Sequence, residues 1–157
     1  GNMKFALNGA LTVGTYDGAN IEIREAVGAD NFYLFGLREE QIQEMRKNNA
    51  YNPRACYENS EYLRRILNAV NSNMFCEKDY VLLFKVIYEE LLNRDYYFLL
   101  ADLEAFNKAL HDAEKDYTNP QKWAKKAIIN VAKIGYFSSD RAVMEYAKNI
   151  WHIKPVD

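Results

Sequence analysis

The spacing of apolar side chains predicts that most of this chain is helical. Beyond residue 36, apolar residues recur every three or four positions, which is the period of an α-helix with one buried face. Polar segments separate these stretches: a loop is predicted over residues 48–54, and residues 71–73 interrupt the pattern. The aromatic residues 96–100 are assigned to neither helix nor strand. The predicted helices cover residues 38–47, 61–70, 79–92, 101–116, 120–134 and 140–154.

The first 36 residues follow another pattern, because glycines separate short apolar segments there. A strand, a helix and a strand at this spacing predict a compact βαβ unit with parallel strands and a right-handed crossover. Two strands are not stable alone, so this unit is expected to come from a larger α/β sheet. The predicted elements are a helix over residues 2–9, a strand over 11–15, a helix over 20–27 and a strand over 31–35.

The predicted fold class is therefore α/β and mostly helical. We expect residues 1–157 to form a single partial domain, with the βαβ piece in residues 1–36 and the helical region in residues 37–157. Polar side chains directly before helices are predicted to cap them. These caps are Asn20, Ser60, Asn119 and Ser139, with Pro120 as a first helical residue and Gly9, Gly28, Gly135 and Pro155 as helix stops.

The amino-acid composition and charge exclude several classes of protein. With 49% hydrophobic and 27% charged residues, the chain is globular rather than disordered. A net charge of −2 gives no reason to expect a nucleic acid or an anionic membrane as a partner. No apolar run reaches the roughly 20 residues of a membrane helix, and we expect no signal peptide. Cys56 and Cys76 lack CxxC spacing, which favours reduced thiols in a cytoplasmic protein over a disulfide.

Lys4 is the candidate for covalent chemistry, because it is the one charged residue before Asp17. Apolar surroundings disfavour the ammonium form of a lysine. Such a lysine can act as an amine nucleophile and form a Schiff base with a carbonyl cofactor. The residues alone leave a second interpretation open, namely a surface lysine near a frayed terminus, since lysines are mostly exposed.

The other polar and aromatic groups are better explained by folding than by chemistry. Residues 17–20 lack the acidic alternation of a calcium loop and predict a turn. His111 and His152 form no motif, and Ser139 has no nearby histidine that would make it a nucleophile. A carbohydrate-stacking platform at residues 96–100 is the alternative to aromatic packing in a core or interface. Trp123 and Trp151 are assigned to packing in the same way, and no metal site is predicted.

Both ends of the chain resemble the glycogen and starch (α-glucan) phosphorylases. Residues 1–5 read Gly-Asn-Met-Lys-Phe and residues 7–20 read Leu-Asn-Gly-Ala-Leu-Thr-Val-Gly-Thr-Tyr-Asp-Gly-Ala-Asn, which is similar to the pyridoxal-phosphate segment of that family. Tyr-Thr-Asn-Pro-Gln-Lys-Trp at residues 117–123 and Phe-Ser-Ser-Asp-Arg at residues 137–141 resemble its last two helices. The likeness is looser over residues 38–115.

The resemblance implies that Lys4 carries pyridoxal 5′-phosphate as a Schiff base. It also implies that Gly1 offers a main-chain N–H to the cofactor phosphate, whose work is proton transfer. The parent enzyme would use phosphate to release glucose 1-phosphate from an α-1,4-glucan. It is expected to be a cytoplasmic, allosteric homodimer with two Rossmann-like domains, of which this chain supplies the end of the second.

Family members are several times longer, and their motif Glu-x-Ser-Gly-Thr-Gly-Asn-Met-Lys begins upstream of Gly1. We therefore expect a C-terminal fragment that is inactive alone and contains no catalytic residue. The alternative is a non-catalytic helical module that packs against a partner chain or a second copy, because a piece of a larger enzyme exposes apolar surface. Cofactor binding and oligomeric state distinguish the two hypotheses.

Overall fold

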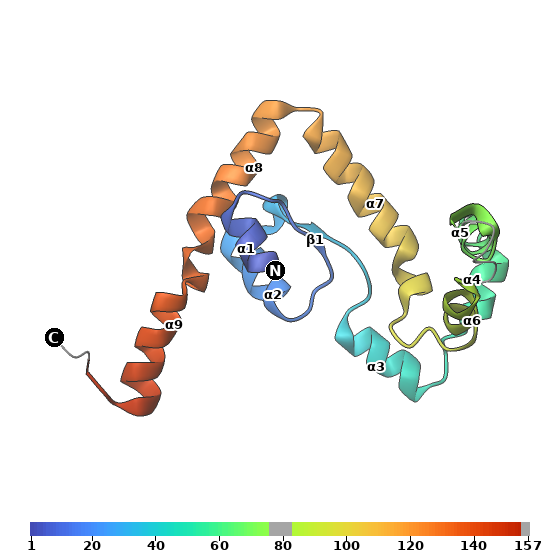
Figure 1. The fold of residues 1–157 in the computed structure, drawn as a ribbon, viewed down its shortest axis with the longest axis horizontal. Coiled ribbons are helices and arrows are strands. Elements are labelled where there is room, and N and C mark those ends of the chain that lie inside the picture. Colours follow the sequence, from blue (N-terminus) through green and yellow to red (C-terminus); the bar gives the residue numbers. More distant parts are fainter. Residues whose placement is uncertain (76–82, 155–157) are drawn as a thin grey trace. The chain divides into compact units, whose positions relative to one another are not determined.

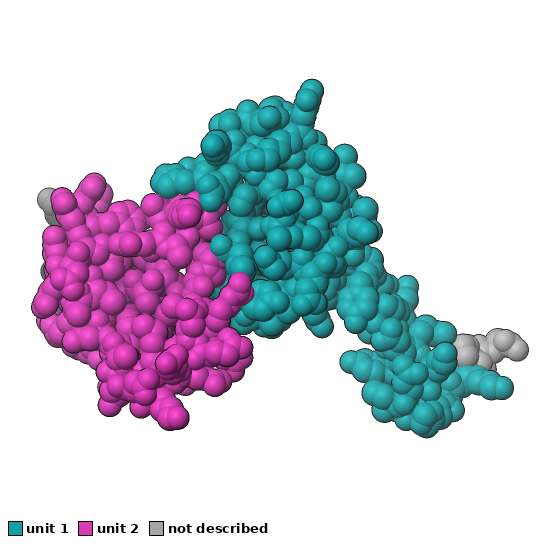
Figure 2. Space-filling view, turned by 180° about the vertical axis from the view of Figure 1, so that it is seen from behind, with its two compact units in different colours: residues 1–34, 110–157 teal, residues 35–109 magenta. Residues whose placement is uncertain are grey.

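The structure, a computed structural model, describes residues 1–75 and 83–154. Contacts divide the chain into two compact units, coloured separately in Figure 2. Unit 1 comprises residues 1–34 and 110–157, and unit 2 comprises residues 35–109. The expectation that residues 1–157 belong to one domain of a larger protein stays a prediction.

Unit 1 begins with the predicted βαβ arrangement. The two strands pair in parallel, with Val13 opposite Tyr33 and Gly14 opposite Leu34. Each strand is only two residues long, so the predicted strands over 11–15 and 31–35 are confirmed in place but not in length. The elements in order are α1 (Asn2–Leu7), β1 (Val13–Gly14), α2 (Ala19–Val27), the 3-10 turn η1 (Ala29–Asn31) and β2 (Tyr33–Leu34).

The rest of unit 1 is helical and comes from the other end of the sequence. Figure 1 shows α8 running beside α1 and α2, and both helices contact it. Their shared core consists of the buried residues Ala6, Ile23, Val27, Phe32 and Ile134. The elements are the end of α7 (Leu99–Tyr117), α8 (Pro120–Lys133), the 3-10 turn η4 (Ile134–Phe137), α9 (Ser139–Tyr146) and the π-helical turn η5 (Ala147–Trp151).

Unit 2 contains the remaining described helices around a second core. The buried leucines Leu63, Leu67, Leu92 and Leu100 form this core. The predicted cap of α5 is confirmed, because the Ser60 hydroxyl accepts a hydrogen bond from Leu63 N at 3.3 Å. The elements are α3 (Glu39–Lys47), α4 (Pro53–Asn59), α5 (Glu61–Val70), the 3-10 turn η2 (Asn73–Phe75), α6 (Lys85–Asn93) and the first part of α7.

The loop predicted over residues 48–54 is confirmed as far as Asn52 and is wrong at Pro53 and Arg54, which begin α4. The Asn52 side chain accepts hydrogen bonds from Arg54 N and Ala55 N, and Pro53 is the first helical residue. The same Asn-Pro signal begins α8, where the Asn119 side chain accepts from Lys122 N as predicted. Proline at this position removes a donor that a helix leaves unpaired in any case.

Two predicted helix caps and one predicted helix stop are displaced by one or two residues. Gly18, with φ +47°, precedes α2, and Asn20 lies inside it; the Asn20 side chain donates to Thr15 O at 3.1 Å. Ser138 precedes α9, so the predicted cap Ser139 is its first residue. Gly135 lies in η4, since α8 ends at Lys133.

Some predictions fall partly outside the described residues. The predicted helix over 79–92 is confirmed as α6 from Lys85 onward, and residues 79–82 are outside the described ranges. Cys76 and Pro155 also lie outside them. Within residues 1–75 and 83–154, no helix combines the length and apolar character needed to cross a bilayer.

Candidate cofactor site at Lys4

Lys4 lies in the middle of α1 with an exposed side chain. Gly1 precedes the helix, and its carbonyl oxygen accepts a hydrogen bond from Phe5 N at 3.1 Å. It ends where the Asn8 side chain donates to Lys4 O at 2.7 Å and Gly9 adopts φ +85°, which confirms the predicted glycine stop. Among the described residues, the Lys4 ammonium makes no hydrogen bond or ion pair, so its amine is not engaged by the chain itself.

A hollow of about 350 Å³ lies beside Lys4. One wall comes from α1, and the opposite wall comes from η4 and the start of α9. Apolar residues make up much of the lining of this hollow, while the Lys4 side chain itself is exposed. The lining residues are Met3, Lys4, Leu7, Ile134, Gly135, Phe137, Ser138 and Ser139.

Two kinds of contact fix the position of α1 beside this hollow. Ala6 is fully buried in the core with Ile23 and Ile134, so one face of the helix is anchored. The Asn2 side chain donates to Asn20 Oδ1 at 3.0 Å, which joins the start of α1 to α2. Lys4 is therefore positioned by a packed helix, although Gly1 itself is exposed.

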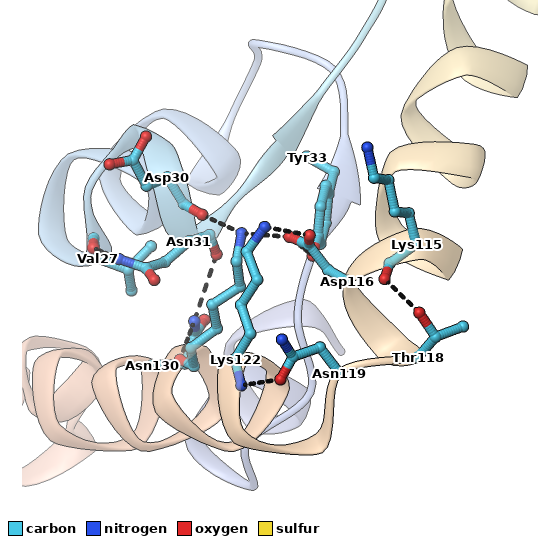
Figure 3. Close-up of polar contacts among 11 residues, drawn as sticks. Val27, Asp30, Asn31, Tyr33, Lys115, Asp116, Thr118, Asn119, Lys122 and Asn130 are labelled. Atoms are coloured by element: carbon cyan, nitrogen blue, oxygen red, sulfur yellow. Dashed lines mark hydrogen bonds and ion pairs between the residues drawn. The ribbon is translucent and has the colours of Figure 1, made fainter.

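Unit 1 also contains a buried polar cluster that sequence reasoning missed (Figure 3). Asp116, at the end of α7, accepts a hydrogen bond from the Tyr33 hydroxyl at 2.9 Å. Its carboxylate also pairs with Lys126 Nζ at 2.9 Å and with Lys122 Nζ. Lys126 Nζ donates in addition to Asp30 O and lies 4.7 Å from the centre of the Tyr33 ring. The cluster joins β2, α7 and α8.

Asn130 extends the cluster by one helical turn. Its side chain is fully buried and donates to Lys126 O at 3.0 Å and to Asn31 O at 3.4 Å. Lys122, Lys126 and Asn130 are spaced by four residues, so they share the face of α8 that meets β2 and η1. Polar residues repeated at helical spacing within an otherwise apolar face were the sequence signal for this cluster.

The cluster changes the acidity of its two acidic members. Hydrogen bonding to Lys122, helped by Lys126 and Tyr33, holds the pKa of the Asp116 carboxyl well below its usual range despite burial. Burial, reinforced by the hydrogen bond to Asp116, raises the pKa of the Tyr33 hydroxyl. Asp116 is therefore ionised and Tyr33 is neutral at any physiological pH.

These shifts predict how stability depends on pH. Because the pKa of Asp116 is lowered, its contribution is complete above about pH 5 and is lost as the pH falls below about 4. Because the pKa of Tyr33 is raised, its contribution is complete below about pH 9 and is lost above about pH 10. We expect urea unfolding at a series of pH values to show a smaller acid decline for Asp116→Asn and a smaller alkaline decline for Tyr33→Phe. Identical pH profiles for the variants and the original chain would contradict this assignment.

Of the other residues considered in the sequence, Ser139 lines the hollow at Lys4, whereas the histidines and tryptophans are not among its lining residues. His111 is exposed, with Nδ1 3.0 Å from Glu114, and His152 is exposed as well. Trp123 stacks near Tyr33 and meets the edge of Tyr117, which confirms its packing role, whereas Trp151 is exposed. Cys56 is free. In the described part of the chain, no three histidine, cysteine or carboxylate side chains come together as metal ligands.

Comparison with known proteins adds the family context. Residues 1–153 match the family described as carbohydrate phosphorylase. Glycogen phosphorylase from Synechocystis sp. is 46% identical over 99% of this chain, and that from Chlamydia trachomatis is 47% identical over 98% of it. The brain form of glycogen phosphorylase from Homo sapiens is 42% identical over the whole chain. The chain spans 18–19% of the length of these relatives.

Proposed function

This chain belongs to the carbohydrate phosphorylase family, and we propose that it is the cofactor-binding part of a pyridoxal-phosphate-dependent α-glucan phosphorylase. The whole enzyme would use phosphate to cleave an α-1,4-glucan and release glucose 1-phosphate. The observation that carries the proposal is an unengaged lysine, Lys4, in the run Gly-Asn-Met-Lys, held by a packed helix beside a hollow.

The residues around Lys4 suit a pyridoxal phosphate group. The amine of Lys4 would form the Schiff base that holds the cofactor. Met3, Leu7 and Phe137 give the hollow an apolar wall for a ring, and its volume of about 350 Å³ is typical of small-molecule sites. When bound, the cofactor supplies a phosphate group that holds and passes a proton. Gly1 would offer its N–H to that phosphate when further chain precedes it, since glycine lets the backbone approach closely.

The role of this chain is therefore to bind and orient, and none of its residues is proposed to be catalytic. The residues that hold the sugar would lie elsewhere in the enzyme, so we propose that the isolated chain is inactive. We further propose that the whole enzyme is a cytoplasmic, allosterically regulated homodimer. Its second Rossmann-like domain would contain both units described here.

A second candidate function is a non-catalytic helical packing module. One observation favours it: α9 and η5 present apolar side chains that are more than half exposed. Exposed apolar surface of this kind promotes association. Sedimentation analysis separates the two, because a packing module would self-associate or bind a partner without binding the cofactor. The exposed residues are Val143, Met144, Tyr146, Ile150 and Trp151.

Labelling of Lys4 tests the proposed function. The chain is titrated with pyridoxal phosphate and reduced with borohydride, and the labelled peptide is identified by mass spectrometry. We expect saturable labelling near one cofactor per chain at Lys4, because its amine lies beside a hollow and has no competing partner in the described structure. Lys4→Arg should abolish this label, and Lys148→Arg, at another exposed lysine, should keep it. Slow labelling spread over many lysines would contradict the assignment.

A further inference from the structure

Two tyrosines in unit 2 project into solvent from the turn between α6 and α7. The side chains of Tyr96 and Tyr97 are 64% and 74% exposed, whereas the next residue, Phe98, is buried. Their rings meet edge to face, with centroids 5.1 Å apart. The aromatic packing expected for residues 96–100 is therefore confirmed for Phe98. Tyr96 and Tyr97 are not buried in either core of the described residues.

The tyrosines lie between two hollows of different character. An apolar hollow of about 280 Å³ is bounded by Tyr96, Tyr97 and apolar residues of α6 such as Ile87 and Leu91. A polar hollow of about 200 Å³ is bounded by Tyr96 together with Arg46, Asn49 and Arg94. Stacking surface and hydrogen-bond donors are thus next to one another.

The turn is held in place although its side chains are exposed. Arg46 Nη2 donates to Tyr96 O at 2.8 Å, and the guanidinium carbon lies 4.6 Å from the centre of the Tyr96 ring. The buried Asp95 carboxylate accepts hydrogen bonds from Leu99 N at 2.9 Å, from Leu100 N at 2.8 Å and from the Tyr51 hydroxyl. A ligand that stacks on a surface held in this way loses little affinity to ordering it.

Backbone strain is concentrated at the same place. Asn49, Asp95 and Phe98 have φ values of +50°, +32° and +59°, and all three line the polar hollow. Among the described non-glycine residues, only His152 also has a positive φ. Left-handed backbone at such residues is unfavourable and tends to occur at functional sites.

We propose that this surface, the tyrosine site, binds a chain of α-1,4-linked glucose, with sugar rings stacked on Tyr97 and Tyr96 and hydroxyl groups bonded to Asn49 and Arg94. The class of ligand rests on the proposed function, which makes a glucan the substrate. The charges agree with an uncharged ligand, because acidic residues accompany the arginines: Arg94 pairs with Glu90 at 3.8 Å, and Arg46 and Asp95 line the same hollow. The site is open and shallow, so each sugar is bound weakly and several linked sugars are needed.

The test is a titration of the full chain with maltoheptaose, followed by ¹H–¹⁵N NMR, with the β-1,4-linked cellohexaose as the stereochemical control. We expect saturable shifts at residues 46–49 and 94–100, a dissociation constant of about 1 mM, and weaker or no binding of cellohexaose. Tyr97→Ala should weaken maltoheptaose binding about tenfold, and Tyr97→Phe should retain it. Tyr62→Ala, at another exposed tyrosine of unit 2, should bind as the original chain does.

Three results would overturn the tyrosine site: no saturable shift in these residues, equal binding of both sugars, or unaltered binding by a folded Tyr97→Ala variant. A self-associated chain that becomes monomeric on Tyr97→Ala would instead identify the surface as a contact between copies. Lys4 labelling is measured without sugar and in unit 1, so the two proposals fail separately. Sugar binding without Lys4 labelling would refute the cofactor assignment and keep the tyrosine site.

Discussion

Replacing Asp116 with alanine is expected to lower the free energy of unfolding by about 3–5 kcal/mol. The substitution leaves the Lys126 ammonium, whose side chain is only 11% exposed, with Asp30 O as its remaining described acceptor. It also removes the acceptor of the Tyr33 hydroxyl. An unpaired buried charge costs far more than the pair itself contributes. Urea unfolding followed by circular dichroism measures the loss.

Two further variants identify the cause of this loss. Asp112→Ala changes an exposed carboxylate one turn earlier in α7 and should alter stability by less than about 0.5 kcal/mol. Asp116→Leu combined with Lys126→Met removes both buried charges and should recover much of the stability lost in Asp116→Ala, because apolar residues of similar volume often replace a buried pair at little cost. A double variant as unstable as Asp116→Ala would show that the uncompensated lysine is not the reason.

Ile23→Ala is expected to cost about 2–5 kcal/mol, because it leaves a cavity in the core of unit 1. Ile23 is fully buried in α2, in the cluster that contains Ala6 and Ile134. These two residues anchor α1 and η4, so the same cavity should also loosen both walls of the hollow at Lys4. We therefore expect slower labelling of Lys4 by pyridoxal phosphate as well as a lower midpoint of urea unfolding.

The matched control for Ile23 is Ile128→Ala on α8, where the isoleucine is 67% exposed. The side chain removed is the same, but little apolar surface leaves the core, and we expect a change within about 0.5 kcal/mol. Equal losses for Ile23→Ala and Ile128→Ala would mean that the described core does not carry the stability of unit 1. In that case helix propensity, which changes equally in both variants, would explain the data.

The sequence predicted helix ends best where they depend only on residues close by in the chain. Asn119 and Pro120 correctly predicted the start of α8, and Gly9 correctly predicted the end of α1. The loop predicted over residues 48–54 was wrong only at its end, because Pro53 begins α4 after Asn52. An Asn-Pro pair can begin either a turn or a helix, and a helix is favoured when the residues that follow pack against a core. Cys56 and Tyr57 of α4 pack against the leucine core of unit 2.

Side chains with long-range partners could not be assigned in this way. Asn20 has the residue type of a cap, yet its side chain bonds to Asn2 and Thr15, and Gly18 begins the helix instead. Tyr96 and Phe98 are both aromatic and two residues apart, but one is exposed and the other is buried. Periodicity alone does not predict which of them faces solvent, because both lie between α6 and α7, where positive φ values at Asp95 and Phe98 depart from helical backbone.

By itself, the sequence determined the family of this protein, the candidate lysine and, apart from α4, the order of the main helices and strands. These features follow from short motifs and local periodicity, whose physical causes act over a few residues. Only the tertiary structure decided that Asp116 and Lys126 form a buried pair with Tyr33, which is 83 residues away from Asp116. It also decided that Lys4 lies beside residues of η4 and that Tyr96 separates two hollows. Burial and electrostatics depend on which distant segments meet, and that outcome is set by the packing of the whole unit.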